Sequence, residues 1–254
     1  MSVNLETATT PKGLTTLANP TRFLALVKTL LPWLTMLTVA LLALGLWMSF
    51  RVADDYQQGR TVRIMFVHVP AVWLAMGAYM TMVSGAFGVL VWRHPLADVA
   101  ARAAAPLGAG FTFLGLVTGS IWGRPMWGTW WVWDARLTSF LVLLIIYLGL
   151  IALWSSIEEP AKSARMAAVA ILVGAINIPI IKFSVEWFTT LHQAASVTRL
   201  GAPTMAAEFL YPLLVMGLAF LFLFLTLHLM AMRNEIMRRQ IRSLQRRAAR
   251  EARK

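Results

Sequence analysis

The sequence predicts an all-α integral membrane protein, a bundle of six transmembrane helices with an external tryptophan-rich loop. Its composition is the first reason, because 59% of the 254 residues are apolar and only 13% are charged, which is too apolar for a soluble globule of this size. The second reason is a series of six long runs without charge. The third is a cluster of five of the 11 tryptophans within residues 122–133.

The uncharged runs match or approach the roughly 20 residues with which a helix crosses a bilayer. They cover residues 29–50, 64–92, 103–123, 137–157, 166–181 and 209–232. We place Pro70 at the first position of the second helix, so His68 should lie just outside that helix, at the membrane surface. Asn177 and Pro179 predict a kink or an early end in the short fifth run.

The distribution of Lys and Arg orients the bundle. Segments 1–28, 93–102, 158–165 and 233–254 hold 16 of the 23 basic residues. The three remaining connections hold 7, together with five acidic residues. Both termini should therefore be cytosolic. The external loops should cover about residues 51–67, 123–136 and 182–208.

We divide the chain into a cytosolic N-terminal tail at 1–28, a six-helix transmembrane domain at 29–232 and a basic cytosolic segment at 233–254. The basic segment carries nine Lys and Arg against two Glu and can continue the sixth helix into the cytosol. Two interpretations fit it, a solvated helix that stays close to the lipid surface or a docking surface for a cytosolic subunit.

Several function classes are excluded or disfavoured. The chain has no cysteine, so disulfides, iron–sulfur clusters and the CxxCH attachment of c-type haem are excluded. It contains no Walker A, GxGxxG, HExxH or GxSxG motif, and we expect no enzyme activity. The six runs contain no charged residue, and only Lys182 and Glu186 lie at the end of the fifth, which disfavours an ion pump. The net charge of +12 follows the membrane topology, and we expect no nucleic acid partner.

Residues 122–138 contain more indole than interfacial anchoring requires, although an aromatic belt is the ordinary alternative. We interpret this segment as a platform for a large, flat, apolar ligand. Its five tryptophans are Trp122, Trp127, Trp130, Trp131 and Trp133.

Two of the four histidines, His68 and His192, should lie on the same external face as the tryptophans. A pair of neutral imidazoles above and below a porphyrin is a common axial set for haem iron. His94 and His228 are most simply interfacial or packing residues.

Arginines on the same face can bind carboxylates such as haem propionates. The alternative for each is an ion pair with Asp54, Asp55 or Asp134, or a contact with lipid phosphate. We expect Asp134 to orient neighbouring indole N–H groups or Arg136. The candidate arginines are Arg60, Arg63, Arg124, Arg136 and Arg199.

The segment WGTWWVWDARLTS (127–139) resembles the tryptophan-rich WWD signature of haem-handling proteins in cytochrome c biogenesis. Its DARLTS ending is similar to the branch called cytochrome c maturation protein C, or haem exporter protein C. The haem-lyase branches instead continue WDPxEN. RIMFVHVPAVW (63–73) and SVEWFTTLHQAAS (184–196) resemble the two external histidine segments of that branch.

The resemblance implies that haem b lies non-covalently against the tryptophan loop, with His68 and His192 as axial ligands. It also implies delivery to a membrane-anchored periplasmic haem chaperone, at a bacterial inner membrane. The implied partners are an ABC ATPase, its membrane subunit and a small single-helix subunit.

Three other functions stay open. The chain could be the membrane permease of an ABC-type complex that exports haem, a b-type membrane cytochrome, or a structural subunit with interfacial aromatics. The permease is the main alternative. A polar trail through the bilayer would favour it, and the sequence shows none.

Overall fold

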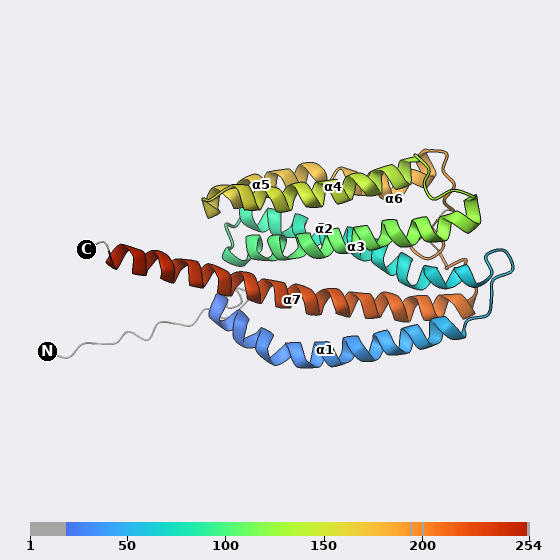
Figure 1. Ribbon diagram of the computed structural model, residues 1–254, viewed down its shortest axis with the longest axis horizontal. Helices are drawn as coiled ribbons and strands as arrows, with labels where there is room; N and C mark the ends of the chain where they lie inside the picture. Colours follow the sequence, from blue (N-terminus) through green and yellow to red (C-terminus); the bar gives the residue numbers. More distant parts are fainter. Residues whose placement is uncertain (1–18, 194, 200, 253–254) are drawn as a thin grey trace.

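The computed structural model describes residues 19–193, 195–199 and 201–252. Seven α-helices and one 3-10 helix make up this part of the chain (Figure 1). Their bounds are α1 Pro20–Arg51, η2 Arg60–Ile64, α2 Met65–Leu90, α3 Pro95–Trp127, α4 Ala135–Ser156, α5 Pro160–Gly174, α6 Asn177–Trp187 and α7 Ala207–Glu251.

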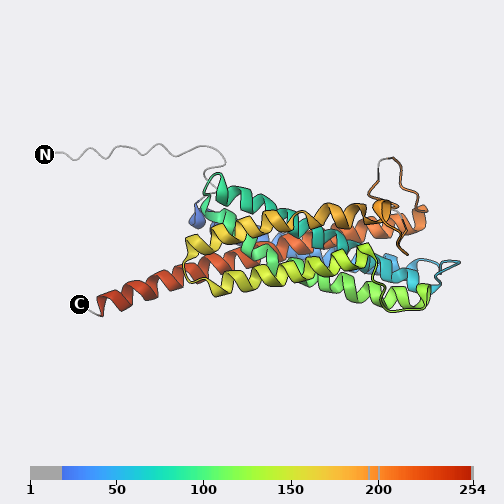
Figure 2. The same ribbon diagram turned by 90° about the horizontal axis from the view of Figure 1, so that it is seen from above.

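Six segments are long and apolar enough to cross a membrane, since α5 and α6 together form one span, Pro160–Trp187. The predicted six-helix, all-α membrane fold is therefore confirmed. The start of α1 and the end of α7 lie at the same end of the bundle, and the long loops gather at the other (Figures 1 and 2). We call the latter the loop end; its loops are residues 52–59, 128–134 and 188–206.

The predicted break in the fifth run is present. The α5 helix ends at Gly174 and α6 begins at Asn177, two residues before Pro179. A proline there cannot donate to the carbonyl of Ala175 and its ring crowds that carbonyl. Ile178 N–H instead bonds the Ala175 carbonyl at 3.1 Å in a tighter turn. The Asn177 amide is buried and donates to the Ser139 carbonyl at 2.9 Å, which fixes the break against α4.

The prediction that His68 lies outside the second helix is wrong. The α2 helix begins at Met65, so His68 is in its first turn and Pro70 lies inside the helix. The cause is packing: Met65 and Phe66 are buried, and the turn before the proline is held in the core. Tertiary burial outweighs the preference of proline for the first helical position.

Other helices extend beyond the uncharged runs, because helices end at caps rather than at charges. The Asn19 side chain caps α1 by accepting from Thr21 N–H at 2.9 Å, and His94 caps α3 by accepting from Leu96 N–H at 3.2 Å. At the loop end, α3 continues to Trp127 and α6 to Trp187. The connections there are consequently shorter than predicted.

The core lies between α2, α3, α4, α5 and the first half of α7. Tyr79 on α2 and Tyr147 on α4 are fully buried and meet edge to face, with ring centroids 5.5 Å apart. Their hydroxyls donate to the carbonyls of Ile171 and Ala75, at 2.9 and 2.7 Å. The α1 helix lies apart from this core and packs mainly on α7.

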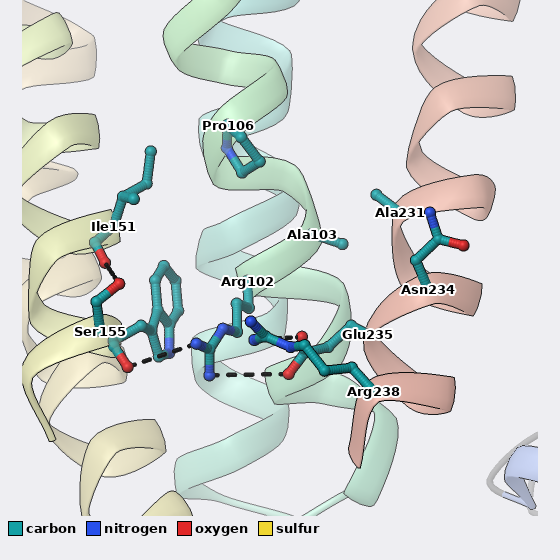
Figure 3. A pocket seen from close by; sticks show the side chains of 10 residues that line it. Arg102, Ala103, Pro106, Ile151, Ser155, Ala231, Asn234, Glu235 and Arg238 are labelled. Carbon is teal, nitrogen blue, oxygen red and sulfur yellow. Dashed lines mark hydrogen bonds and ion pairs between the residues drawn. The ribbon is translucent and has the colours of Figure 1, made fainter. Parts of the chain in front are cut away.

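The α7 helix is unbroken from Ala207 to Glu251 and projects past the bundle at the end opposite the loops (Figure 1). Buried charges hold it where it leaves the bundle. Arg239 pairs with Asp98 and, at 2.8 Å, with Glu235. Arg102 and Arg238 also reach Glu235, at 3.7 and 2.6 Å (Figure 3). The predicted continuation of the last helix into the basic segment is therefore present.

Candidate functional site

The C-terminal half of α3 forms the wall on which His68 rests. The Nδ1 atom of His68 lies 3.0 Å from the hydroxyl of Thr118. That hydroxyl donates its single hydrogen to the Leu114 carbonyl at 2.6 Å, so its oxygen is left to accept from Nδ1–H. The Nε2 atom of His68 then carries the free lone pair that a metal ion would use.

A glycine lets the imidazole approach α3 closely. A Cβ atom at Gly119 would lie only 2.9 Å from Cε1 of His68. The ring of Trp122 meets His68 edge to face, with centroids 5.6 Å apart. Its indole N–H donates to the Gln58 side chain at 3.0 Å, which ties α3 to the 52–59 loop.

His192 lies in the 188–206 loop and is held by Asp134. The Nδ1 atom of His192 is 3.1 Å from Oδ2 of Asp134, and the Thr190 hydroxyl donates to the same oxygen. The other carboxylate oxygen of Asp134 accepts from Leu137 N–H at 2.8 Å and caps α4. One carboxylate thus starts a helix and fixes an imidazole, and Nε2 of His192 also keeps a free lone pair.

Burial, hydrogen bonds and neighbouring charges set the charge states of Asp134 and His192. Burial by itself would raise the pKa of Asp134, but hydrogen bonds from Thr190 and Leu137 and the proximity of His192 hold that pKa below its ordinary value. Burial lowers the pKa of the His192 imidazole, although Asp134 acts in the opposite direction. At neutral pH the site therefore holds a carboxylate and a neutral imidazole.

Trp127 brings His192 to the same helix that supports His68. Its ring meets the His192 imidazole edge to face at a centroid distance of 4.8 Å. A Cβ atom at Gly123 would lie 2.9 Å from Cε3 of Trp127, so this glycine makes room for the indole. Residues of α3 therefore contact both imidazoles, Thr118 and Trp122 that of His68 and Trp127 that of His192.

The other three indoles lie in the 128–134 loop, which starts at Gly128 in the left-handed conformation, φ 76°. Trp131 is half-buried and meets Trp133 edge to face at 5.4 Å. Its buried indole N–H has no acceptor among the described residues. Trp130 and Trp133 are 58% and 76% exposed. The loop thus presents two indole faces outward and one unused donor inward.

The structure separates the candidate arginines. Arg63 donates to the Val52 carbonyl and to Asp54, both at 3.1 Å, and Arg124 donates to the Gly128 carbonyl. Arg136 is half-buried and its Nε atom donates to the Ser184 hydroxyl at 3.2 Å. Among the described residues no carboxylate lies within ion-pairing distance of Arg136, so it keeps its charge available inside the site.

The partners expected for Asp134 differ from those observed. We predicted indole N–H groups or Arg136, whereas the hydrogen bonds go to Leu137, Thr190 and His192. The reason is that Asp134 is the cap of α4. Its carboxylate is turned toward the helix start and the loop that crosses it.

A family model described as Heme exporter protein C (CcmC) matches residues 13–247 of this chain. The chain belongs to this family. It is 65% identical over 229 residues to Heme exporter protein C of Bradyrhizobium diazoefficiens, covering 90% of this chain and 87% of that protein. The protein of the same name from Escherichia coli K12 is 47% identical over 228 residues, covering 89% and 91%. That of Paracoccus denitrificans is 42% identical over 228 residues, covering 89% and 95%.

In this member of the Heme exporter protein C family, the sequence did not reveal the residues that support His68 and His192. These are Gln58, Thr118, Gly119, Gly123 and Thr190. One signal was present: Gly115, Gly119 and Gly123 repeat every four residues, a spacing that allows close approach on one helix face. Thr190 carries no comparable signal, because its role depends on how the loop folds over α4.

Proposed function

We propose that this protein binds haem b non-covalently at the loop end, with His68 and His192 as axial ligands, and delivers it to a membrane-anchored haem chaperone during c-type cytochrome biogenesis. The observation that carries the proposal is that each imidazole is hydrogen-bonded through Nδ1, to Thr118 and to Asp134, while no described residue forms a hydrogen bond with its Nε2. Such outer hydrogen bonds fix the tautomer and orientation of metal-binding histidines. The family name, Heme exporter protein C, agrees with haem as the ligand.

The surrounding groups suit a porphyrin. Trp122 and Trp127 lie against the two histidines and supply apolar ring surface, each good aromatic contact adding about 1 kcal/mol. Arg136 is the arginine we assign to a propionate, because it is half-buried and has no carboxylate partner among the described residues. Arg60 and Arg63 both pair with Asp54, and Arg124 and Arg199 are exposed. The exposed rings of Trp130 and Trp133 are the surface we assign to handing haem to the chaperone.

The loop end would face the periplasm of a bacterial inner membrane, and both termini would face the cytosol. Most Lys and Arg lie in connections at the opposite end, in agreement with the positive-inside rule. An ABC ATPase, its membrane subunit and a small single-helix subunit are the proposed partners, because the chain belongs to the Heme exporter protein C family. Bringing no ATP-binding motif of its own, the chain would act as a binding and delivery subunit rather than an enzyme.

The axial ligands are tested with the purified His68→Ala/His192→Ala double variant. We expect loss of haem and of the haem absorption bands. His94→Asn is the matched control, because His94 lies at the opposite end and asparagine is also a good helix cap. Full haem with an unchanged visible spectrum in the double variant would refute the assignment.

Delivery and export make different predictions about the ATPase. In cells that express this protein and the chaperone without the ATPase, delivery predicts haem bound at the loop end. A permease driven by ATP predicts none there. Family membership leaves this choice to the experiment, and the clustering of ligand-type residues at one end favours delivery.

A further inference from the structure

A groove between α1 and α7 lies at the end of the bundle opposite His68 and His192. Its volume is about 390 Å³. It is lined by Lys28, Leu31, Pro32, Thr35, Met230 and Arg233. Thr35 donates its hydroxyl hydrogen to the Leu31 carbonyl at 2.8 Å, so the lining below the two cations is apolar or internally satisfied.

The level of the two cations follows from the helices themselves. Lys28 is the last charge before the uncharged run 29–50 of α1, and Arg233 is the first after the run 209–232 of α7. At 1.5 Å per residue the α1 run is about 33 Å long, close to the hydrocarbon thickness of a bilayer. Both cations therefore lie at the level of the lipid headgroups. The groove continues from there toward Thr35, into the hydrocarbon region.

The local helix geometry keeps the groove open. Pro32 lies inside α1, where its ring crowds the Lys28 carbonyl and bends a helix. The α1 helix curves over its N-terminal half (Figure 1). One step further in, the Thr38 and Thr226 hydroxyls lie 3.1 Å apart and close the contact between α1 and α7.

The charge in this groove is not neutralised by the described part of the protein. Within residues 19–252 neither Lys28 nor Arg233 has a carboxylate in ion-pairing distance, and the buried Nε atom of Arg233 has no hydrogen-bond partner. The neighbouring pocket between α3, α4 and α7 differs, because its Arg102 and Arg238 both pair with Glu235 (Figure 3). Of these two pockets, the α1–α7 groove is the one whose cations have no carboxylate partner among the described residues.

We propose that this groove binds one anionic phospholipid from the adjoining leaflet. The phosphate lies between the Lys28 ammonium and the Arg233 guanidinium. The N–H groups of both cations donate hydrogen bonds to the phosphate oxygens. One acyl chain follows Leu31, Pro32 and Met230. The ligand couples α1, which packs on little besides α7, to the rest of the bundle.

The test compares the full-length protein with the Lys28→Gln/Arg233→Gln variant in detergent. Retained lipid is measured by native mass spectrometry, and thermal stability is measured with added phosphatidylglycerol or phosphatidylcholine. We expect the parent protein to retain one anionic lipid. We also expect phosphatidylglycerol to raise its thermal stability and phosphatidylcholine to leave it unchanged. Because the variant lacks both interfacial cations, its affinity for the anionic lipid should fall about 30-fold.

Matched controls separate this site from general attraction. Arg242→Gln/Arg246→Gln removes the same charge from the exposed part of α7 and should bind like the parent. The exchange Lys28→Arg/Arg233→Lys keeps both charges and should also bind. If the double glutamine variant does not fold, Lys28→Gln alone serves, because Lys28 is exposed. Equal effects of both lipids, or equal losses in the Arg242/Arg246 control, would overturn the proposal.

Discussion

Replacing Asp134 with Asn separates the two tasks of this carboxylate. Oδ1 caps α4 through Leu137 N–H at 2.8 Å, while Oδ2 accepts from Thr190 and from His192 at 3.1 Å. An asparagine has only one acceptor oxygen. If that oxygen caps the helix, the amide N–H₂ group faces two donors. Each lost hydrogen bond to a charged group costs about 1.5–3 kcal/mol, so the loop that carries His192 is released.

We expect Asp134→Asn to lower haem affinity about 10- to 100-fold, the usual effect of removing the hydrogen-bonding partner of a metal-binding histidine. Haem titration followed in the Soret band measures the change, and circular dichroism shows that the helices persist. Glu186→Gln removes the same charge from an exposed position at the loop end and should leave affinity unaltered. Parent-like affinity in Asp134→Asn would refute the view that this carboxylate positions the ligand.

Three further results follow from the geometry. Gly119→Ala places a Cβ atom 2.9 Å from the His68 imidazole, so thermal denaturation should show a loss of about 1–3 kcal/mol of stability. Gly110→Ala is the control on the same helix, because a Cβ atom there meets open space, and it should cost no stability. Trp127→Ala removes the ring that contacts His192 and should reduce haem retained on purification, unlike Trp92→Ala at an exposed position of the opposite end. Because burial lowers the pKa of His192, the unfolded chain binds its proton first. Stability should therefore decline as pH falls below about 6.5, and a His192→Gln variant titrated in parallel should show a smaller decline; an identical profile would contradict the assignment.

The six spans could be predicted because charged side chains are costly in the hydrocarbon core, so each helix that crosses it carries a long uncharged run in the sequence. Helix starts could not, since they depend on caps and on packing. His68 shows this best. The proline rule places it outside α2, but burial of Met65 and Phe66 extends the helix past it.

For the site, the sequence likewise reveals the residue types but not their contacts. The histidines, tryptophans and arginines can be recognised in the sequence of three loops. Which arginine is uncommitted depends on the pairing of Arg63 with Asp54, a contact nine residues apart in a turn. The link from Asp134 to His192 spans 58 residues, and no local pattern reveals it.

The two imidazoles belong to different kinds of structure, one to a packed helix and the other to a loop. His68 belongs to a helix packed directly on α3, and its ring lies close against Gly119. His192 belongs to the 188–206 loop, which is fastened by side-chain contacts such as those of Asp134 and by Lys182 to Thr198 at 2.7 Å. One histidine of the pair is therefore fixed by helix packing, and the other is fixed by the contacts of a loop. If a flat ligand binds between the two imidazoles as proposed, opening of the Asp134 contacts would release His192, and with it the ligand, without any change in the packing of the membrane helices.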